Sequence, residues 1–284
     1  MAKQIGSGGL VAAGLGWGLA LGVVLGAAVL APAIPGGPDV FNGAFRSDVD
    51  HSAATDETTG QTQESSEAQQ RFDAAEDLLS RESVSIVSGA LTDVPVAIVR
   101  TNTASDDDVA SVRWLLNAAG ASDAGELRLT EKFTDQNAAD ELSTLIASTL
   151  PSGAQLSVDN RSPGMHAGQS LASIMLIDPA TNEAPAQASD RSLVMDTLQQ
   201  SGFVEHKGSI VPAEAVVVVD GKPDAAGGEF GAKLLRDFAE ALGEAGTTVL
   251  ASQEIAPKEL RGVATVGAVD SETGRISTVL AVAE

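Results

Sequence analysis

The feature that most constrains this chain is an uncharged apolar run near its start. Leu10–Ala31 holds 22 residues without a charged or strongly polar side chain. At about 1.5 Å per residue, a helix of this length reaches roughly 33 Å, enough to cross a hydrocarbon core of about 30 Å. We therefore expect residues 10–31 to form one transmembrane helix.

The charges that flank this run predict its orientation. Lys3 precedes it, and the first charged residue after it is Asp39. The positive-inside rule then places residues 1–9 in the cytoplasm and the rest of the chain outside. The alternative is a cleaved signal peptide, since Ala31 and Ala33 have the small side chains of a cleavage site. The apolar core of a signal peptide is only about 7–15 residues long, so a single-pass anchor in the cell membrane is favoured.

Glycines are spaced regularly within the predicted span. Gly14, Gly18, Gly22 and Gly26 recur every four residues and would line one helix face. A second helix could approach closely there, either in a homodimer or from a separate membrane protein. The alternative is the general enrichment of glycine in membrane helices.

The composition changes sharply after the span. Residues 39–82 carry 11 acidic and three basic residues. Residues 32–64 are predicted to be an acidic linker, because Ser47–Gln63 has too few apolar residues to bury anything. Residues 65–83 predict a helical stalk, with an apolar stripe formed by Ala68, Phe72, Ala75 and Leu79. Such a helix forms either a short dimer stalk or a helix packed on its own domain, and the shortness of the stripe favours the second.

Residues 84–284 alternate between apolar runs and helical periods, which predicts an extracytoplasmic α/β domain. The expected strands are 94–100, 127–129, 215–219, 247–251, 263–269 and 276–282, and the expected helices are 106–119, 137–150, 170–177, 191–201 and 231–242. Nearly continuous apolar strands indicate a doubly wound, mainly parallel sheet covered on both faces. The turn-rich link Asp270–Arg275 predicts that the last two strands form an antiparallel edge.

Charge and residue usage exclude several classes of function. The chain has 17 Lys and Arg against 39 Asp and Glu, a formal net charge of −22. Binding to nucleic acid or to anionic lipid needs basic residues, so neither is expected. No cysteine is present, which excludes disulfides, thiolate metal sites and a cysteine nucleophile.

Two predicted loops carry residues that could bind a ligand. Asp220–Gly231 places glycines before a helix, as phosphate sites do. Its spacing matches neither dinucleotide nor P-loop patterns, and four acidic residues lie in or near it, so a plain loop is favoured. Asp106–Asp108 could hold a hard cation, but three carboxylates at a helix start are better explained by capping and by the helix dipole.

Met165 and His166 are the candidate metal ligands. Thioether and imidazole groups suit copper, and Met175 and Met195 could lie nearby. The alternative is an exposed loop at Met165–His166 with the other methionines in the core. His166 and His206 could each join a Ser-His-Asp arrangement, although no motif typical of such enzymes is present. We therefore expect no enzyme and no resident cofactor, with copper as the one possible metal.

Five segments together resemble a known family. They are Leu19–Gly26, Gly89–Leu91, Val94–Thr101, Asp106–Ala110 and Val269–Ala281. The chain resembles the actinobacterial copper transport protein B family, MctB, called SteB in corynebacteria. It departs from the family in the stalk, which tends to be a longer charged coiled coil in family members.

The resemblance implies two roles. One is copper efflux or tolerance, with the protein assigned to the outer membrane of a mycolic-acid envelope. The other is cell separation, in which the anchored domain pairs with a membrane partner of the SteA type and influences peptidoglycan hydrolases. A single span and the absence of a clear ligand cluster favour a non-catalytic interaction module, with copper transport as the alternative. An envelope enzyme with a nucleotide near Gly227–Gly231 is a third, weaker hypothesis.

Overall fold

The computed structural model describes residues 53–222 and 227–284, with the surroundings of side chains from residue 66 onward. The predicted cytoplasmic segment 1–9, the span 10–31 with its glycine face, and residues 32–52 of the predicted linker lie outside the described residues. Among the helices described, none combines the length and apolar character needed to cross a membrane. The chain divides into two units, residues 1–74 and 75–284, and the second contains the whole sheet.

The first described element is the long helix α2, Ala53–Val87. It includes residues 65–83, where the sequence predicts a helix, but it begins at Ala53, within the stretch predicted to be a linker. The extra turns contain no proline and several alanine, glutamate and glutamine residues, which favour helix. Low hydrophobicity was therefore a poor guide to backbone conformation here.

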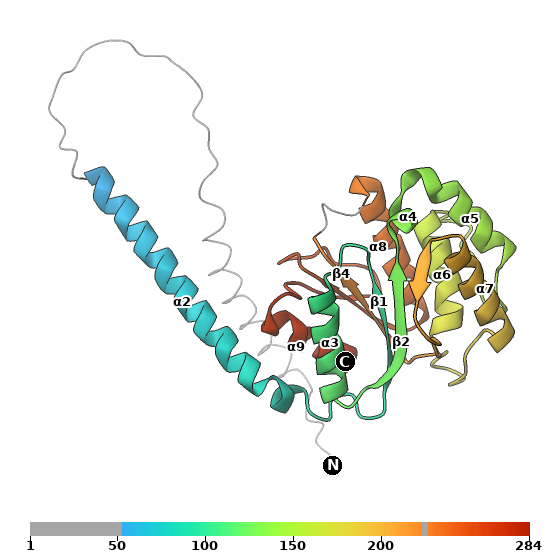
Figure 1. The fold of residues 1–284 in the computed structure, drawn as a ribbon, viewed down its shortest axis with the longest axis horizontal. Coiled ribbons are helices and arrows are strands. Elements are labelled where there is room, and N and C mark those ends of the chain that lie inside the picture. Colours follow the sequence, from blue (N-terminus) through green and yellow to red (C-terminus); the bar gives the residue numbers. More distant parts are fainter. Residues whose placement is uncertain (1–52, 223–226) are drawn as a thin grey trace, which may run out of the picture. The chain divides into compact units, whose positions relative to one another are not determined.

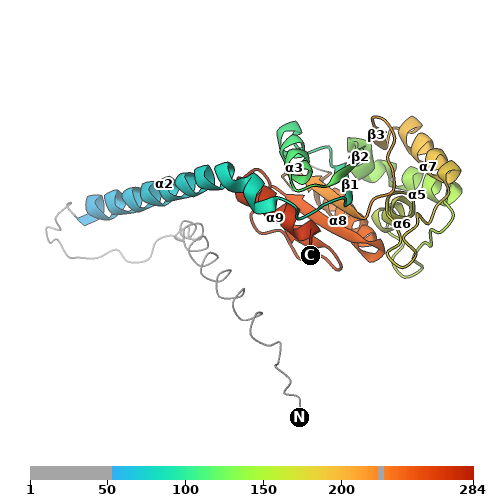
Figure 2. The same ribbon diagram turned by 90° about the horizontal axis from the view of Figure 1, so that it is seen from below.

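The C-terminal part of α2, from Ala75 onward, belongs to the second unit and packs on it. Leu79 is partly buried against the core, and Ser83 and Val87 are buried. Glu76 accepts hydrogen bonds at the start of helix α9, Glu272–Val282: from the backbone N–H of Glu272 at 2.7 Å and from Thr273 Oγ1 at 2.6 Å. Figures 1 and 2 both show α9 beside this end of α2.

Six strands form one sheet in the order β3-β2-β1-β4-β5-β6. Their bounds are β1 Pro95–Arg100, β2 Ser122–Leu129, β3 Val204–His206, β4 Ala215–Asp220, β5 Thr247–Ser252 and β6 Ala264–Val266. All neighbouring pairs are parallel except β2 with β3. The order therefore runs outward in both directions from β1 and β4, which lie side by side at its centre.

Helices cover both faces of the sheet (Figure 1). Besides α9 and the end of α2 from Ala75 onward, the helical elements of this unit are α3 Asp106–Ala118, α4 Glu131–Thr134, the 3₁₀ turn η1 Gln136–Ala138, α5 Ala139–Ser148, α6 Pro163–Met175, α7 Ala188–Gln200 and α8 Gly228–Ala245. Alternate residues of β1 enter opposite cores, as the two-residue period of a strand requires. Val99 packs with α5–α8, whereas Ile98 packs with α3 and α9.

Helices α6 and α8 pack closely against each other, and two glycines permit it. A Cβ added to Gly168 would lie 2.6 Å from both the Phe238 carbonyl oxygen and Ala241 Cβ. A Cβ added to Gly164 would overlap the Leu234 carbonyl oxygen. Phe238 of α8 also packs against Phe133: the two rings meet edge to face, with centroids 5.5 Å apart.

The prediction of a mainly parallel α/β sheet with an antiparallel edge is confirmed, but the position of that edge was wrong. The antiparallel strand is β3, at the opposite side of the sheet from the C-terminus. Residues 276–282, predicted as a strand, form most of helix α9. Ser271 caps this helix by accepting from the backbone N–H of Gly274, so the segment predicted as a turn link is a helix start.

Candidate functional site

The geometry of the sheet points to its centre as the place for a ligand. In open parallel sheets, ligands bind beyond the carboxyl ends of the strands where the strand order reverses. That point lies here between β1 and β4. Thr101 follows β1, and Asp220 ends β4; Thr101 Oγ1 donates to Asp220 Oδ1 at 2.6 Å and Thr103 Oγ1 donates to the same oxygen at 2.9 Å. The two threonines therefore fix the position of the carboxylate.

A cavity of about 170 Å³ opens beside this carboxylate. Its apolar wall includes Val218 of β4 and Leu250 of β5, and its charged lining includes Asp220, Arg236 and Lys258. We call this cavity the switch-point pocket. The sequence analysis considered a ligand at the Asp220–Gly231 loop but favoured a plain loop, and no pattern in the sequence pointed to Arg236 or Lys258, because only the fold brings these segments to one edge.

The three carboxylates of Asp106–Asp108 do not converge on one point. Asp106 pairs with Arg100 at 2.6 Å, whereas the buried Asp108 accepts from Gln253 Nε2 at 2.6 Å and from Ser105 Oγ at 2.7 Å. Ser105 in turn accepts from the backbone N–H of Asp108 at 3.0 Å. The arrangement matches the capping interpretation of this motif.

The ion pair between Arg100 and Asp106 leads to a prediction about the pKa of Asp106. A hydrogen bond from Arg100, reinforced by its positive charge, holds the pKa of Asp106 below its ordinary value. The ionised pair thus adds stability above the unfolded-state pKa, and this contribution is lost as the pH falls through the lower folded-state pKa. We expect Arg100→Gln to raise the pKa of Asp106 toward its ordinary value in an NMR titration. Arg128→Gln, which removes a weaker and more distant charge, should raise it less.

The glycine-containing loop before α8 is only partly described. Residues 223–226 lie outside the described residues, so the predicted Asp220–Gly231 loop is seen at its two ends. Gly227 and Gly228 have left-handed backbone angles, φ 62° and 63°, at the start of α8. Helix α8 begins at Gly228, three residues before the predicted start.

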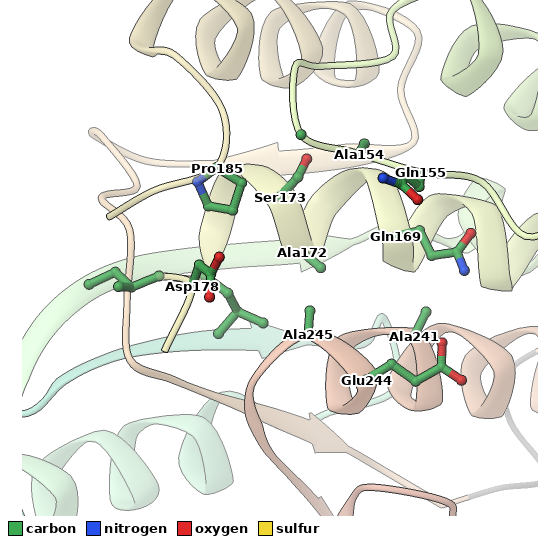
Figure 3. Close-up of a pocket in the computed structure, with 13 residues that line it drawn as sticks. Ala154, Gln155, Gln169, Ala172, Ser173, Asp178, Pro185, Ala241, Glu244 and Ala245 are labelled. Carbon is green, nitrogen blue, oxygen red and sulfur yellow. The ribbon is translucent and has the colours of Figure 1, made fainter. Parts of the chain in front are cut away.

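A second and larger cavity, about 460 Å³, lies in a groove between α6 and the C-terminal end of α8 (Figure 3). Small side chains leave this space open: Ala172 faces α8, and Ala241 and Ala245 face α6. The charged side chains that line it, Asp178 and Glu244, are both acidic. The groove therefore disfavours anions, and Glu244 also pairs with Arg261 at 2.9 Å.

Met165 and His166 lie in α6, not in an exposed loop. Met165 is 2% exposed, and Met175 and Met195 are buried in the core. The half-buried His166 has Nε2 2.9 Å from the Ser157 carbonyl oxygen. Because a carbonyl oxygen only accepts, Nε2 is the donor in this contact, and Nδ1 is the ring nitrogen left for another partner. Adjacent helical residues do not face each other, so a shared copper ion would need ligands from other elements.

The described residues contain no group of three or more His, Asp or Glu side chains placed to hold a metal ion. Within the same part of the chain, His166 and His206 bond to backbone carbonyl oxygens of Ser157 and Gly208 and to no serine hydroxyl or carboxylate. His51 lies outside the described residues. The copper prediction at Met165 and His166 therefore stays a prediction.

Comparison with known proteins identifies relatives along most of the chain. A family model described as "Copper transport outer membrane protein, MctB" matches residues 10–284. Copper transporter MctB of Mycobacterium tuberculosis (strain ATCC 25618 / H37Rv) is 34% identical over 217 residues, covering 69% of this chain and 68% of that protein. The Mycobacterium leprae (strain TN) protein of the same name is 33% identical over 222 residues with the same coverage. These matches confirm the resemblance seen in the sequence, and the chain belongs to the MctB family.

Proposed function

We propose that this protein takes part in copper transport at the cell envelope, as an anchored, non-catalytic accessory protein. The observation that carries this proposal is its membership of the MctB family across residues 10–284. Residues 10–31 supply the single-pass anchor, and the α/β domain lies outside the cytoplasm. Copper is the cargo here and not a resident cofactor.

The packing of the domain supports an accessory role over a conducting one. Both faces of the sheet are filled by apolar clusters, with Ile98 and Val217 in one and Val99 and Val218 in the other. An ion would therefore travel along the domain surface and not through its interior, because burial of an unpaired charge is costly. We propose that a second copy of the chain or a separate membrane protein completes the path across the membrane.

Met165 and His166 are the residues we propose to contact copper, with a thioether sulfur and the His166 Nδ1 nitrogen as ligands. Cell-associated copper should rise in a deletion strain under copper challenge, and the full-length protein should restore the normal level. A Met165→Leu/His166→Gln variant should fail to restore it. The leucine keeps the buried volume of Met165, so a loss of function would not come from a cavity at that position.

Met195→Leu is the matched control, because it removes a buried thioether from α7 and should complement fully. Unchanged copper in the deletion strain would refute the transport proposal; chains of unseparated cells in the same strain would then favour the cell-separation role. Full complementation by Met165→Leu/His166→Gln would refute the ligand assignment alone and leave the accessory role standing.

A further inference from the structure

Acidic and basic side chains line the switch-point pocket without forming ion pairs with one another. Arg236 of α8 and Lys258 line it together with Asp220 and Glu254, yet neither cation lies within 4.0 Å of either carboxylate. Other cations in the described residues do form such pairs, as Lys233 does with Asp237 at 2.5 Å on the same helix. Among the described residues, the pocket therefore presents two cations and two carboxylates that are not paired with one another.

Hydrogen bonds hold the carboxylate of Asp220 in one position at the edge of the pocket. Both threonine hydroxyls donate to Asp220 Oδ1, and Oδ2 has no partner among the described residues. Gly221 holds the turn that follows: its N–H donates to Thr103 Oγ1 at 3.2 Å, and an added Cβ would overlap the Thr103 carbonyl oxygen. A free carboxylate oxygen held in this way is a ready acceptor for an ammonium group.

The rest of the pocket limits the size and polarity of its ligand. Val218, Leu235, Leu250 and Leu260 form an apolar wall. The volume of about 170 Å³ is smaller than the roughly 300–1,000 Å³ of pockets that hold drug-sized ligands, so we expect a small ligand. Arg236 is half-buried and carries the planar guanidinium that binds carboxylates through two parallel hydrogen bonds.

We infer that the switch-point pocket binds a free α-amino acid with an apolar side chain. The ligand ammonium bonds to Asp220 Oδ2, its carboxylate lies against Arg236 with Lys258 nearby, and its side chain packs on the apolar wall. This binding site is separate from copper handling at Met165 and His166.

Isothermal titration calorimetry of the full-length chain with L-leucine and L-alanine tests the inference. Two analogues of leucine separate the charges: 4-methylpentanoate lacks the ammonium group, and 3-methylbutylamine lacks the carboxylate. We expect leucine to bind and each analogue to bind at least tenfold more weakly. Asp220→Asn and Arg236→Gln should each weaken leucine binding by at least tenfold.

Arg261→Gln is the control, since Arg261 is an exposed arginine outside the pocket and should leave binding unchanged. Lys258→Gln supplies a second test on an exposed side chain, where the substitution does not disturb folding; it should weaken leucine binding several-fold. The inference is overturned if neither amino acid binds, if either analogue binds as well as leucine, or if Asp220→Asn and Arg236→Gln, folded normally by circular dichroism, bind like the unmodified chain. None of these outcomes depends on copper.

Discussion

Gly168→Ala is expected to destabilise the domain by about 1–3 kcal/mol, although the same change in an isolated helix stabilises it by about 1 kcal/mol. The sign reverses because the new Cβ would lie 2.6 Å from the Phe238 carbonyl oxygen and from Ala241 Cβ. The backbone of α8 cannot yield without disturbing Phe238, which is fully buried against Phe133. Urea unfolding followed by circular dichroism measures the change.

Gly168→Val should cost more than Gly168→Ala, because two further methyl groups enter the same interface. Ala147→Val is its matched control: Ala147 is exposed on α5, so only the helix-propensity difference of about 0.6 kcal/mol is expected. A gain in stability for Gly168→Ala would show that α6 and α8 are free to separate and that the close contact is not needed. The groove between these helices begins next to this contact, so the same variants test what keeps the groove in shape.

The strands at the centre of the sheet were predictable from the sequence. The segment 215–219 is a continuous apolar run, and the strand found there, Ala215–Asp220, is buried along almost its whole length. Burial on both faces removes the need for polar residues, so the run itself is the signal. The predicted strands 94–100 and 247–251 are confirmed for the same reason.

The edges of the fold were not predictable in this way. Strand β3 has only three residues, Val204–His206, which is too short for a periodic signal. The C-terminal segment was misjudged because its β-branched residues suggested a strand. Its buried positions Ile276, Val279 and Val282 are three apart, as in a helix, and Ser271 supplies the cap. Giving spacing more weight than β propensity would have identified α9.

The switch-point pocket shows which part of a site a sequence can indicate. The strand that ends at Asp220 was visible, and general rules for α/β sheets point to the loop after it. In the sequence, Arg236 comes after residues 223–226, which lie outside the described residues, and Lys258 follows strand β5. No local sequence pattern therefore connects either residue to Asp220. Their convergence follows from the parallel pairing of β4 and β5.

Asp108→Ala is expected to destabilise the domain by about 2–4 kcal/mol, because it leaves buried polar partners without an acceptor. Asp108 is 4% exposed and connects three elements: its Oδ2 accepts from Gln253, which follows β5, and its Oδ1 lies 3.6 Å from Arg275 of α9. Without this carboxylate, the Gln253 amide loses its partner and the Arg275 guanidinium loses one of its two acidic neighbours.

Asp107→Ala is the control, since it removes a neighbouring carboxylate from the same first turn of α3. Asp107 is exposed, so its loss affects only the helix dipole, an effect of about 0.3–1 kcal/mol. Equal losses of stability in the two variants would mean that Asp108 contributes only through its charge at the N-terminus of α3. A double-mutant cycle with Arg275→Met separates the two roles: a coupling energy above about 0.5 kcal/mol is expected from a direct pair, whereas a shared dipole effect predicts additivity. The cycle therefore measures how strongly α9, the element that the sequence pattern failed to identify, is held to the start of α3.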